Sequence, residues 1–356
     1  MIGGTRRSVN AVIDLTAEDA EVFAEAWRDF SSAPSANTSA PSAVKESLVN
    51  SRPQGSLTVP AFAKINPRLC VLGKRADGYH ELDTIFQTVS LHDTITFEVT
   101  KTAEIALSCD DPSLPEGPEN LVCQAAEALQ KRFAQRTGAR IRLEKRIPAQ
   151  AGLGGGASDS AVTLLALAHL WELAANGNDL LEIASSLGAD VPFFLFGGTA
   201  HGTGIGNRIA PLPDVDEKFV LIIKPNTNSS TARAYQSLNS GSLTSTEAKT
   251  ILSTSQPDEI FGSFHSEALE NDFERVVFEH APEIERAKAA LMNSGADAAL
   301  LAGSGSAVFG IFDCENAQER AIQAIVLEAG WRVFPCRTVG RNGYRSALGD
   351  LFRRLD

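Results

Sequence analysis

The chain has 356 residues, a length that exceeds the usual size of one hydrophobic core and favours two domains. Hydrophobic residues make up 43% and charged residues 21%, as in ordinary globular proteins, and no window approaches the roughly 18 consecutive apolar residues of a membrane-spanning helix. The formal net charge of -12 disfavours nucleic acid as a partner but not small anionic ligands, which local groups can hold.

Residues 1–56 differ in composition from the rest and are expected to form an N-terminal extension. A short helix is predicted after Thr16, where acidic residues fill the first turn and Phe23 and Trp27 share one face. Residues 31–56 contain eight serines and three prolines, which is typical of a flexible linker. The acidic residues argue against a transit peptide, and the sequence leaves open whether the helix docks on the body or on a partner.

From residue 57 onward, strand and helix patterns alternate. Strands are predicted at 69–72, 93–99 and 140–144, and an apolar helix at 161–175 is expected to be buried on all sides. After a proline-rich turn at 211–214, the pattern predicts a core strand at 219–225, a strand at 307–312, and helices at 281–293 and 317–329. No internal repeat is present, so the fold class is α+β.

A glycine-rich segment directly precedes the apolar helix. Glycines at a helix start let the backbone curl with its N–H groups pointing inward, and the helix dipole favours anionic oxygen there. The segment lacks the lysine of a Walker A loop, and a helix occupies the place where a dinucleotide-binding motif needs a second strand. We expect this segment to form a phosphate-binding loop, and the alternative is a plain glycine hinge. The loop consists of Pro148, Ala149, Gln150, Ala151, Gly152, Leu153, Gly154, Gly155, Gly156, Ala157 and Ser158.

Three polar residues stand in apolar surroundings. Lys64 and Asn66 occupy alternate positions and therefore one face of an extended segment. Asp190 lies in a strongly apolar run, and a buried carboxylate needs a cation or hydrogen-bond donors nearby, for which Lys64 is a candidate. Together with a phosphate loop these residues predict phosphoryl transfer to a hydroxyl, the alternative being an ordinary buried ion pair.

A third cluster surrounds the turn signal Asp77-Gly78. Tyr79 offers an aromatic face and His80 a ring nitrogen, which suits a planar ligand. A turn histidine that is merely solvated is the alternative interpretation.

The cysteines are five in number and widely spaced, without a C-x-x-C pair. We expect reduced thiols rather than disulfides or a zinc site, and a cytoplasmic location. The composition gives no oligomeric state.

These motifs, in this order, resemble the GHMP kinases. The resemblance runs from about residue 60 to near the C-terminus, more than four fifths of the chain. It rests on Ala63-Lys-Ile-Asn, Gly73-Lys-Arg-Ala-Asp-Gly-Tyr-His, the glycine loop, Gly188-Ala-Asp-Val-Pro-Phe-Phe, Asn271-Asp-Phe-Glu and Leu301-Ala-Gly-Ser-Gly-Ser. The segments around His80 and Asp190 point within the family to a kinase that acts on a cytidyl sugar.

The resemblance implies a two-domain GHMP kinase fold, with a half similar to domain 2 of ribosomal protein S5 at 57–212, a ferredoxin-like half at 213–356, and the active site between them. It implies ATP with Mg²⁺ and transfer of the γ-phosphoryl group to the 2-hydroxyl of a cytidyl sugar-alcohol diphosphate built on methylerythritol, in the non-mevalonate isoprenoid pathway. The small-molecule partners are therefore ATP and this diphosphate.

The resemblance also implies roles for single residues. Asp190 matches the catalytic aspartate that receives the hydroxyl proton, and Lys64 the lysine beside it. Lys145 matches a lysine that contacts the nucleotide, in addition to residues 148–158. The protein ligands of the magnesium are not implied, although Ser158 lies near enough to the phosphates to be one. The residues that match the acceptor site are Asn66 for the methylerythritol part, His80 for the cytosine edge, Tyr79 and Tyr235 for stacking on the base, Thr231 close to the ligand, and Ser304 from the second domain.

Two departures from the family pattern and two rival functions remain. Pro67-Arg68 stands where the family has an apolar residue, which puts the local strand pairing in doubt, and Asn207 replaces a common acidic residue. The rivals are another GHMP kinase, such as one acting on homoserine or mevalonate, and a non-catalytic nucleotide-binding module. Intact Lys64 and Asp190 argue against the module.

Overall fold

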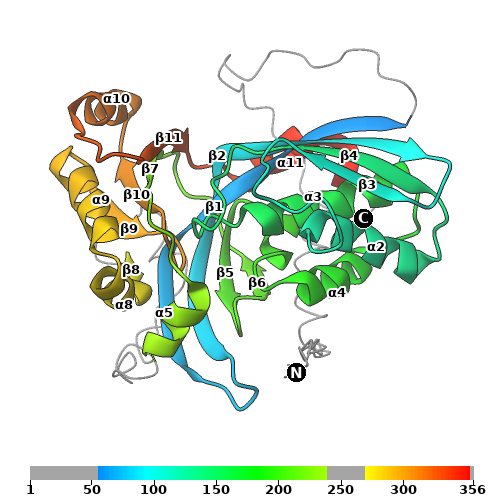
Figure 1. The fold of residues 1–356 in the computed structure, drawn as a ribbon, viewed down its shortest axis with the longest axis horizontal. Helices are drawn as coiled ribbons and strands as arrows, with labels where there is room; N and C mark the ends of the chain where they lie inside the picture. Colours follow the sequence, from blue (N-terminus) through cyan, green and yellow to red (C-terminus); the bar gives the residue numbers. More distant parts are fainter. Residues whose placement is uncertain (1–54, 239–268, 353–356) are drawn as a thin grey trace, which may run out of the picture.

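The computed structural model describes residues 55–238 and 269–352. Two β-sheets lie side by side, each covered by helices, and the helices of the two halves occupy opposite ends of the long axis (Figure 1). This arrangement confirms the α+β class. The predicted helix after residue 16 and the linker at 31–56 lie outside the described residues, apart from the last two positions of that linker.

The first sheet is built on two long strands, β1 (Ser56–Lys74) and β2 (His80–Thr100), which form an antiparallel hairpin. The strand order is β3-β4-β2-β1-β8, and β5 pairs with β2 and with β6. The predicted strands at 69–72 and 93–99 are parts of β1 and β2, and the alternating burial of β4 confirms the period-two pattern at 140–144. The remaining strands are β3 (Ile105–Cys109), β4 (Gly138–Glu144), β5 (Thr199–Thr203), β6 (Arg208–Pro211) and β8 (Glu270–Asn271).

A bulge interrupts the pairing of β1 with β2 at one of the departures from the family pattern. The register shifts between Ile65 and Arg68, so Asn66 and Pro67 have no partner in the ladder. Proline cannot donate a ladder hydrogen bond, and a bulge is where this loss costs least. Arg68 is buried and donates from Nε to the Cys70 sulfur at 3.2 Å. The local pairing is therefore interrupted for two residues and then resumes.

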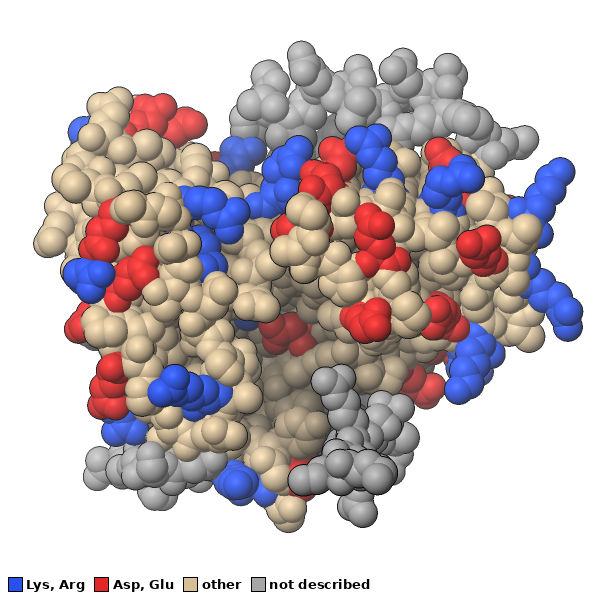
Figure 2. Space-filling view, in the orientation of Figure 1, with Lys and Arg blue, Asp and Glu red and all other residues tan. Residues whose placement is uncertain are grey.

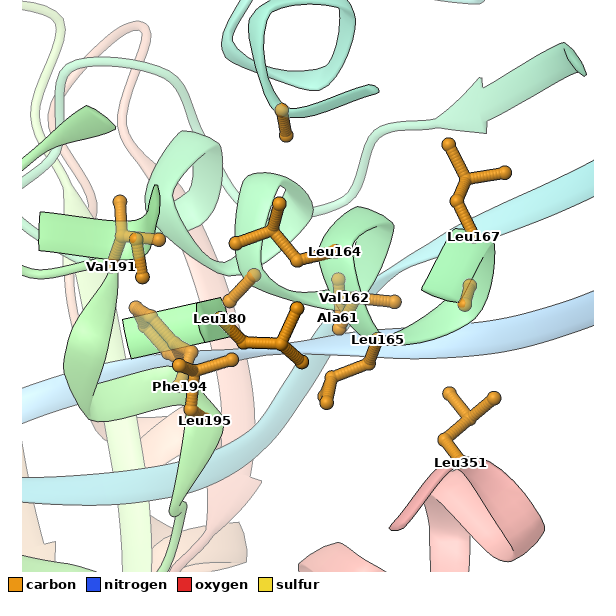
Figure 3. Packing of buried hydrophobic residues seen from close by; sticks show 14 of the residues in the cluster. Ala61, Val162, Leu164, Leu165, Leu167, Leu180, Val191, Phe194, Leu195 and Leu351 are labelled. Carbon is orange, nitrogen blue, oxygen red and sulfur yellow. The ribbon is translucent and has the colours of Figure 1, made fainter. Parts of the chain in front are cut away.

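Three helices cover one face of the first sheet: α2 (Leu121–Phe133), α3 (Gly155–Leu170) and α4 (Gly177–Leu187). Every α3 residue from 158 to 168 is buried, as its uninterrupted apolar character predicted. The helix was predicted at 161–175 but begins at Gly155 and ends at Leu170, because Gly154 in the left-handed region (φ 72°) starts it earlier. Figure 3 shows α3 leucines packed with Leu180 and Phe194.

The second sheet has the antiparallel order β11-β7-β10-β9. Its strands are β7 (Phe219–Lys224), β9 (Ala298–Leu301), β10 (Val308–Phe312) and β11 (Arg332–Arg337). The strands predicted at 219–225 and 307–312 and the helix predicted at 281–293 are confirmed, within one residue at an end. The helix predicted at 317–329 is α10 and is shorter, since it ends at Ala324. The helices are α5 (Thr231–Leu238), α8 (Phe273–His280), α9 (Pro282–Asn293) and α10 (Glu315–Ala324).

The end of the chain returns to the first half. Helix α11 (Arg341–Leu348) and the following 3-10 turn (Gly349–Phe352) contribute Tyr344, Leu348 and Leu351 to the core around α3. The fully buried Tyr344 hydroxyl donates to the carbonyl of Phe194 at 2.5 Å. Strand β8 likewise joins the first sheet, beside β1. Contacts therefore cross the predicted division at residues 212 and 213, and that boundary stays a prediction.

The described residues contain neither a disulfide nor a long apolar helix. All five cysteines lie within the described residues and are unpaired. Among the described helices, none is long and apolar enough to cross a membrane.

Candidate active site

A cavity of about 560 Å³ lies between the two halves, and Figure 2 shows the surface hollowed there. Every residue predicted for catalysis or for the acceptor lines it, although these residues come from positions as far apart as 64 and 304. The predicted residues in its wall are Lys64, Asn66, Tyr79, His80, Asp190, Thr231, Tyr235 and Ser304, together with Gly152 and Gly154 of the loop.

Lys64 and Asp190 meet in this cavity. Lys64 Nζ lies 3.3 Å from Asp190 Oδ2, which confirms the predicted proximity. The prediction that Asp190 is buried is wrong, because its side chain is 37% exposed while that of Lys64 is 4% exposed. The apolar run after Asp190 is the buried 3-10 turn η1 (Pro192–Leu195), and the aspartate precedes it at the cavity surface. A carboxylate in this position can reach a bound ligand.

Asn66 lies beside the lysine on β1, as the alternate spacing predicted. Its Oδ1 accepts a hydrogen bond from Lys64 Nζ at 2.6 Å, and its Nδ2 donates to Thr84 Oγ1 on β2 at 2.9 Å. Asn66 is 1% exposed and Thr84 is also 1% exposed. The ammonium of Lys64 also lies over the ring of Phe86, with Nζ 5.5 Å from the ring centroid.

Aromatic rings form one wall of the cavity. The His80 ring stacks on Tyr235 from α5 with centroids 4.9 Å apart, and Phe273 meets Tyr235 edge to face at 4.8 Å. His80 is 7% exposed, so the solvated-histidine alternative is wrong. Tyr79 is 46% exposed and sits at the hairpin turn, where its backbone N–H donates to Asp77. Burial, and secondarily the charge of Asp190, raise the pKa of Tyr235 above its usual value.

The glycine loop wraps the start of α3. Gln150, Gly152 and Gly154 all have positive φ, which is the curled backbone that the glycines predicted. Gly154 is the N-cap and supplies no side-chain hydrogen bond, so no side chain caps the first-turn N–H groups of α3. The Ser158 hydroxyl, in the first turn, is buried without a hydrogen-bond partner. A ligand with anionic oxygens suits such a helix start.

A second loop, residues 302–306, packs against the first. The N–H of Ala307 donates to the carbonyl of Ala151 at 3.0 Å, and a Cβ on Gly152 would meet the Ala302 carbonyl oxygen at 1.8 Å. Ser304 shares a hydrogen bond of 2.7 Å with Thr231 at the start of α5. The two halves therefore close on each other through backbone contacts at the cavity.

Lys145 lies in a buried ionic cluster next to the glycine loop. Its Nζ donates to Asp93 Oδ2 and, at 2.8 Å, to Asp159 Oδ2 on α3. Asp93 Oδ1 also accepts the N–H groups of Arg146 and Ile147, at 2.5 and 2.8 Å. Burial lowers and the two carboxylates raise the pKa of Lys145, with a net increase. Lys145 also lines a cavity of about 400 Å³ that runs along the loop.

Comparison with known proteins places these motifs in a family. Residues 120–198 match the GHMP kinases N terminal domain and residues 259–330 the GHMP kinases C terminal domain. The 4-diphosphocytidyl-2-C-methyl-D-erythritol kinase of Citrifermentans bemidjiense is 40% identical over 285 residues, which cover 80% of this chain and 99% of that protein. The kinase of the same name from Solibacter usitatus is 42% identical over 297 residues, 80% of this chain and 90% of that protein.

The chain belongs to the 4-diphosphocytidyl-2-C-methyl-D-erythritol kinase family. A crystal structure of 4-(cytidine 5'-diphospho)-2C-methyl-D-erythritol kinase matches with a TM-score of 0.65 and 33% identity, and covers 80% of this chain and 100% of that one. The homoserine kinase of Cytophaga hutchinsonii matches with a TM-score of 0.62 and 17% identity, over 83% of this chain and 98% of that one, and shares the fold. The chain is thus an enzyme of the GHMP kinase family.

The motifs in the sequence did not predict some residues of this kinase site. Thr84, Phe86 and Phe273 line the cavity, and Asp93 anchors the segment before the glycine loop. Thr84 and Phe86 lie on β2 two residues apart, so the period of a strand could have placed them on one face. No sequence signal pairs Asp93 with Lys145, which lies 52 residues away. The other departure from the family pattern, Asn207, is buried in the turn between β5 and β6.

Proposed function

We propose that the cavity binds ATP and 4-diphosphocytidyl-2-C-methyl-D-erythritol and transfers the γ-phosphoryl group to the 2-hydroxyl of the methylerythritol unit. This reaction gives the 2-phosphate and ADP, as a step of the non-mevalonate isoprenoid pathway. The observation that carries the proposal is the Lys64–Asp190 pair, 3.3 Å apart in a cavity that the glycine loop also lines. The relatives that bear this name span four fifths of the chain and favour it over the homoserine and mevalonate alternatives.

The glycine loop fits the phosphates of ATP. Its backbone N–H groups at the start of α3 lack a side-chain cap and can donate to phosphate oxygens. We propose that residues 148–158 hold the triphosphate, and that Lys145, held by two aspartates, shapes the nucleotide pocket along the loop. Mg²⁺ bound with ATP would neutralise charge on the phosphoryl group, and the partnerless Ser158 hydroxyl is a fitting ligand for it.

Asp190 and Lys64 act on the acceptor hydroxyl. Asp190 is exposed to the cavity and can accept the proton, and the nearby ammonium of Lys64 favours negative charge on the oxygen from which the proton leaves. In the loose transition state of phosphoryl transfer the proton leaves late, so orientation and charge matter more than the strength of the base. Lys64 in turn is fixed by Asn66, which we propose also contacts the methylerythritol part.

The aromatic wall suits the cytosine ring. Tyr235 is held by Phe273 and stacks on His80, which gives the base a rigid apolar face and a ring nitrogen for its edge. The exposed Tyr79 at the hairpin turn is positioned to cover the other side of the base. Thr231 and Ser304, joined by their hydrogen bond, supply hydroxyls where the two halves meet. A cytoplasmic location and the absence of a nucleic-acid partner stay predictions from composition.

An ADP-release assay tests this function. The purified chain is supplied with MgATP and the cytidyl substrate, beside 2-C-methyl-D-erythritol 4-phosphate, homoserine and mevalonate as alternative acceptors. We expect ADP release and a phosphorylated product with the cytidyl substrate alone. Turnover that prefers homoserine or mevalonate would overturn the substrate assignment, and binding of ATP without turnover of any acceptor would favour the non-catalytic module.

A further inference from the structure

The hydrogen bonds around Lys64 continue beyond the residues that face the substrate. Lys64 Nζ donates to Asn66 Oδ1 at 2.6 Å, and Asn66 Nδ2 donates to Thr84 Oγ1 at 2.9 Å. Thr84 Oγ1 donates to the backbone carbonyl of Arg68 at 2.8 Å, at the end of the β1 bulge. All four residues are less than 9% exposed, so water does not readily replace a lost partner.

The donors and acceptors in this series of hydrogen bonds can be arranged in only one way. A carbonyl oxygen can only accept, so the single proton of the Thr84 hydroxyl is committed to Arg68. The Thr84 oxygen can then only accept from Asn66, which forces the amide NH₂ group toward Thr84. The amide oxygen consequently faces Lys64, and an amide turned the other way would place two donors against each other.

We infer that Thr84 is a positioning residue for the phosphoryl transfer, acting on Lys64 through Asn66. This inference rests on the proposed function, because it gives Thr84 a role in setting the ammonium beside Asp190. Thr84 holds the amide of Asn66 in the orientation that gives Lys64 an acceptor on its β1 side, and that acceptor helps hold Nζ 3.3 Å from the Asp190 carboxylate. The β1 bulge that accommodates Pro67 ends at Arg68, whose carbonyl orders the hydroxyl of Thr84.

Substitution of Thr84 by valine and by serine tests the inference. Thr84→Val keeps the shape and removes the hydroxyl, and we expect kcat to fall about tenfold, with little change in KM for ATP. Thr84→Ser keeps the hydroxyl and is expected to restore most of the rate. Wild-type kcat in Thr84→Val, or an equal loss in Thr84→Ser, would overturn the inference.

A matched control lies on the same strand. Thr88 is fully buried on β2, opposite Lys64 in the ladder, and its hydroxyl has no hydrogen-bond partner. Thr88→Val makes the same chemical change without breaking a side-chain bond, so we expect kcat within about twofold of wild type. If Thr88→Val lowers kcat as much as Thr84→Val does, the effect belongs to strand packing and the inference fails.

A double-mutant cycle separates positioning from stability. If Thr84 acts through Asn66, Thr84→Val should have no further effect on kcat in an Asn66→Ala background. If Thr84→Val lowers kcat in the Asn66→Ala background by the same factor as in the wild-type background, its role is structural and the inference fails.

A second measurement does not depend on turnover. The side-chain amide protons of Asn66, seen by NMR with ¹⁵N-labelled asparagine and assigned by their loss in Asn66→Ala, report the bond to Thr84 directly. We expect their shifts to change in Thr84→Val and to persist in Thr84→Ser; unchanged shifts in Thr84→Val would refute the bond. An unreactive wild-type chain in which the shifts behave as expected would overturn the proposed function, while the hydrogen-bond arrangement would stand.

Discussion

Gly152→Ala tests the contact between the two glycine-containing loops. The added Cβ would lie 1.8 Å from the carbonyl oxygen of Ala302 and 2.8 Å from its carbonyl carbon. The two loops must separate by about 1.2 Å to restore a distance of 3.0 Å, and the opposing atom is backbone, which cannot rotate away. The hydrogen bond from Ala307 to Ala151 spans the same contact and would be strained.

The cost of this substitution can be worked out from two effects. Gly152 has φ +81°, where an L-residue costs about 1–2 kcal/mol, and overpacking costs about 1–3 kcal/mol. We therefore expect the free energy of unfolding to fall by about 2–5 kcal/mol in urea titrations, with weakened ATP binding by calorimetry.

Gly156→Ala is the matched control for stability. Its Cβ would meet only the Leu121 Cδ1 atom, at 3.6 Å, and Gly156 lies in the first turn of α3. Alanine in a helix favours folding by up to about 1 kcal/mol over glycine, so the control should be as stable as wild type or more so. A Gly152→Ala protein within about 0.5 kcal/mol of wild type would refute the reasoning, since the two loops would then separate without cost.

Three further outcomes follow from the site. Asp190→Asn should keep substrate binding but lose about 10²–10⁴ in kcat, measured by ADP release; near-normal turnover would contradict its role as base. His80→Ala should raise KM for the cytidyl substrate about tenfold or more and leave KM for ATP unchanged, because Tyr235 loses its ring partner on the acceptor side only. Burial raises the pKa of Asp159 to about 7 from 3.8, so the folded state binds more protons than the unfolded state between these values. Wild type should therefore lose stability relative to Asp159→Asn as pH rises from about 4 to 7 in thermal denaturation, and parallel pH curves would contradict the shift.

The sequence predicted most of the site because its residues are polar groups in apolar or glycine-rich surroundings. Lys64 and Asn66 share a strand face by their spacing, and the left-handed glycines mark the start of α3. The exposure of Asp190 could not be predicted, because it depends on a cavity wall that the second half of the chain completes.

Long-range pairings were likewise beyond the sequence. Asp93 binds Lys145 from another strand of the first sheet, and nothing in the local pattern of either segment specifies that partner. In the local pattern Thr84 is one more polar residue of a strand, and only its pairing with Leu69, next to the end of the β1 bulge, brings its hydroxyl to Asn66 and to the carbonyl of Arg68. The ends of α3 and α10 differ from the predicted ones by several residues, because the Gly154 N-cap starts α3 early and extended backbone at Ile325 ends α10.

The return of α11 to the first half has a consequence for biosynthesis. Tyr344, Leu348 and Leu351 complete the core around α3, yet the strands of the second sheet lie between them and the rest of that core in the sequence. Part of the apolar surface of the first half therefore stays uncovered until the second sheet and α11 have been synthesised. The two halves therefore cannot complete their cores one after the other in the order of synthesis. A chain that stops before residue 341 would lack the three residues that complete the core around α3.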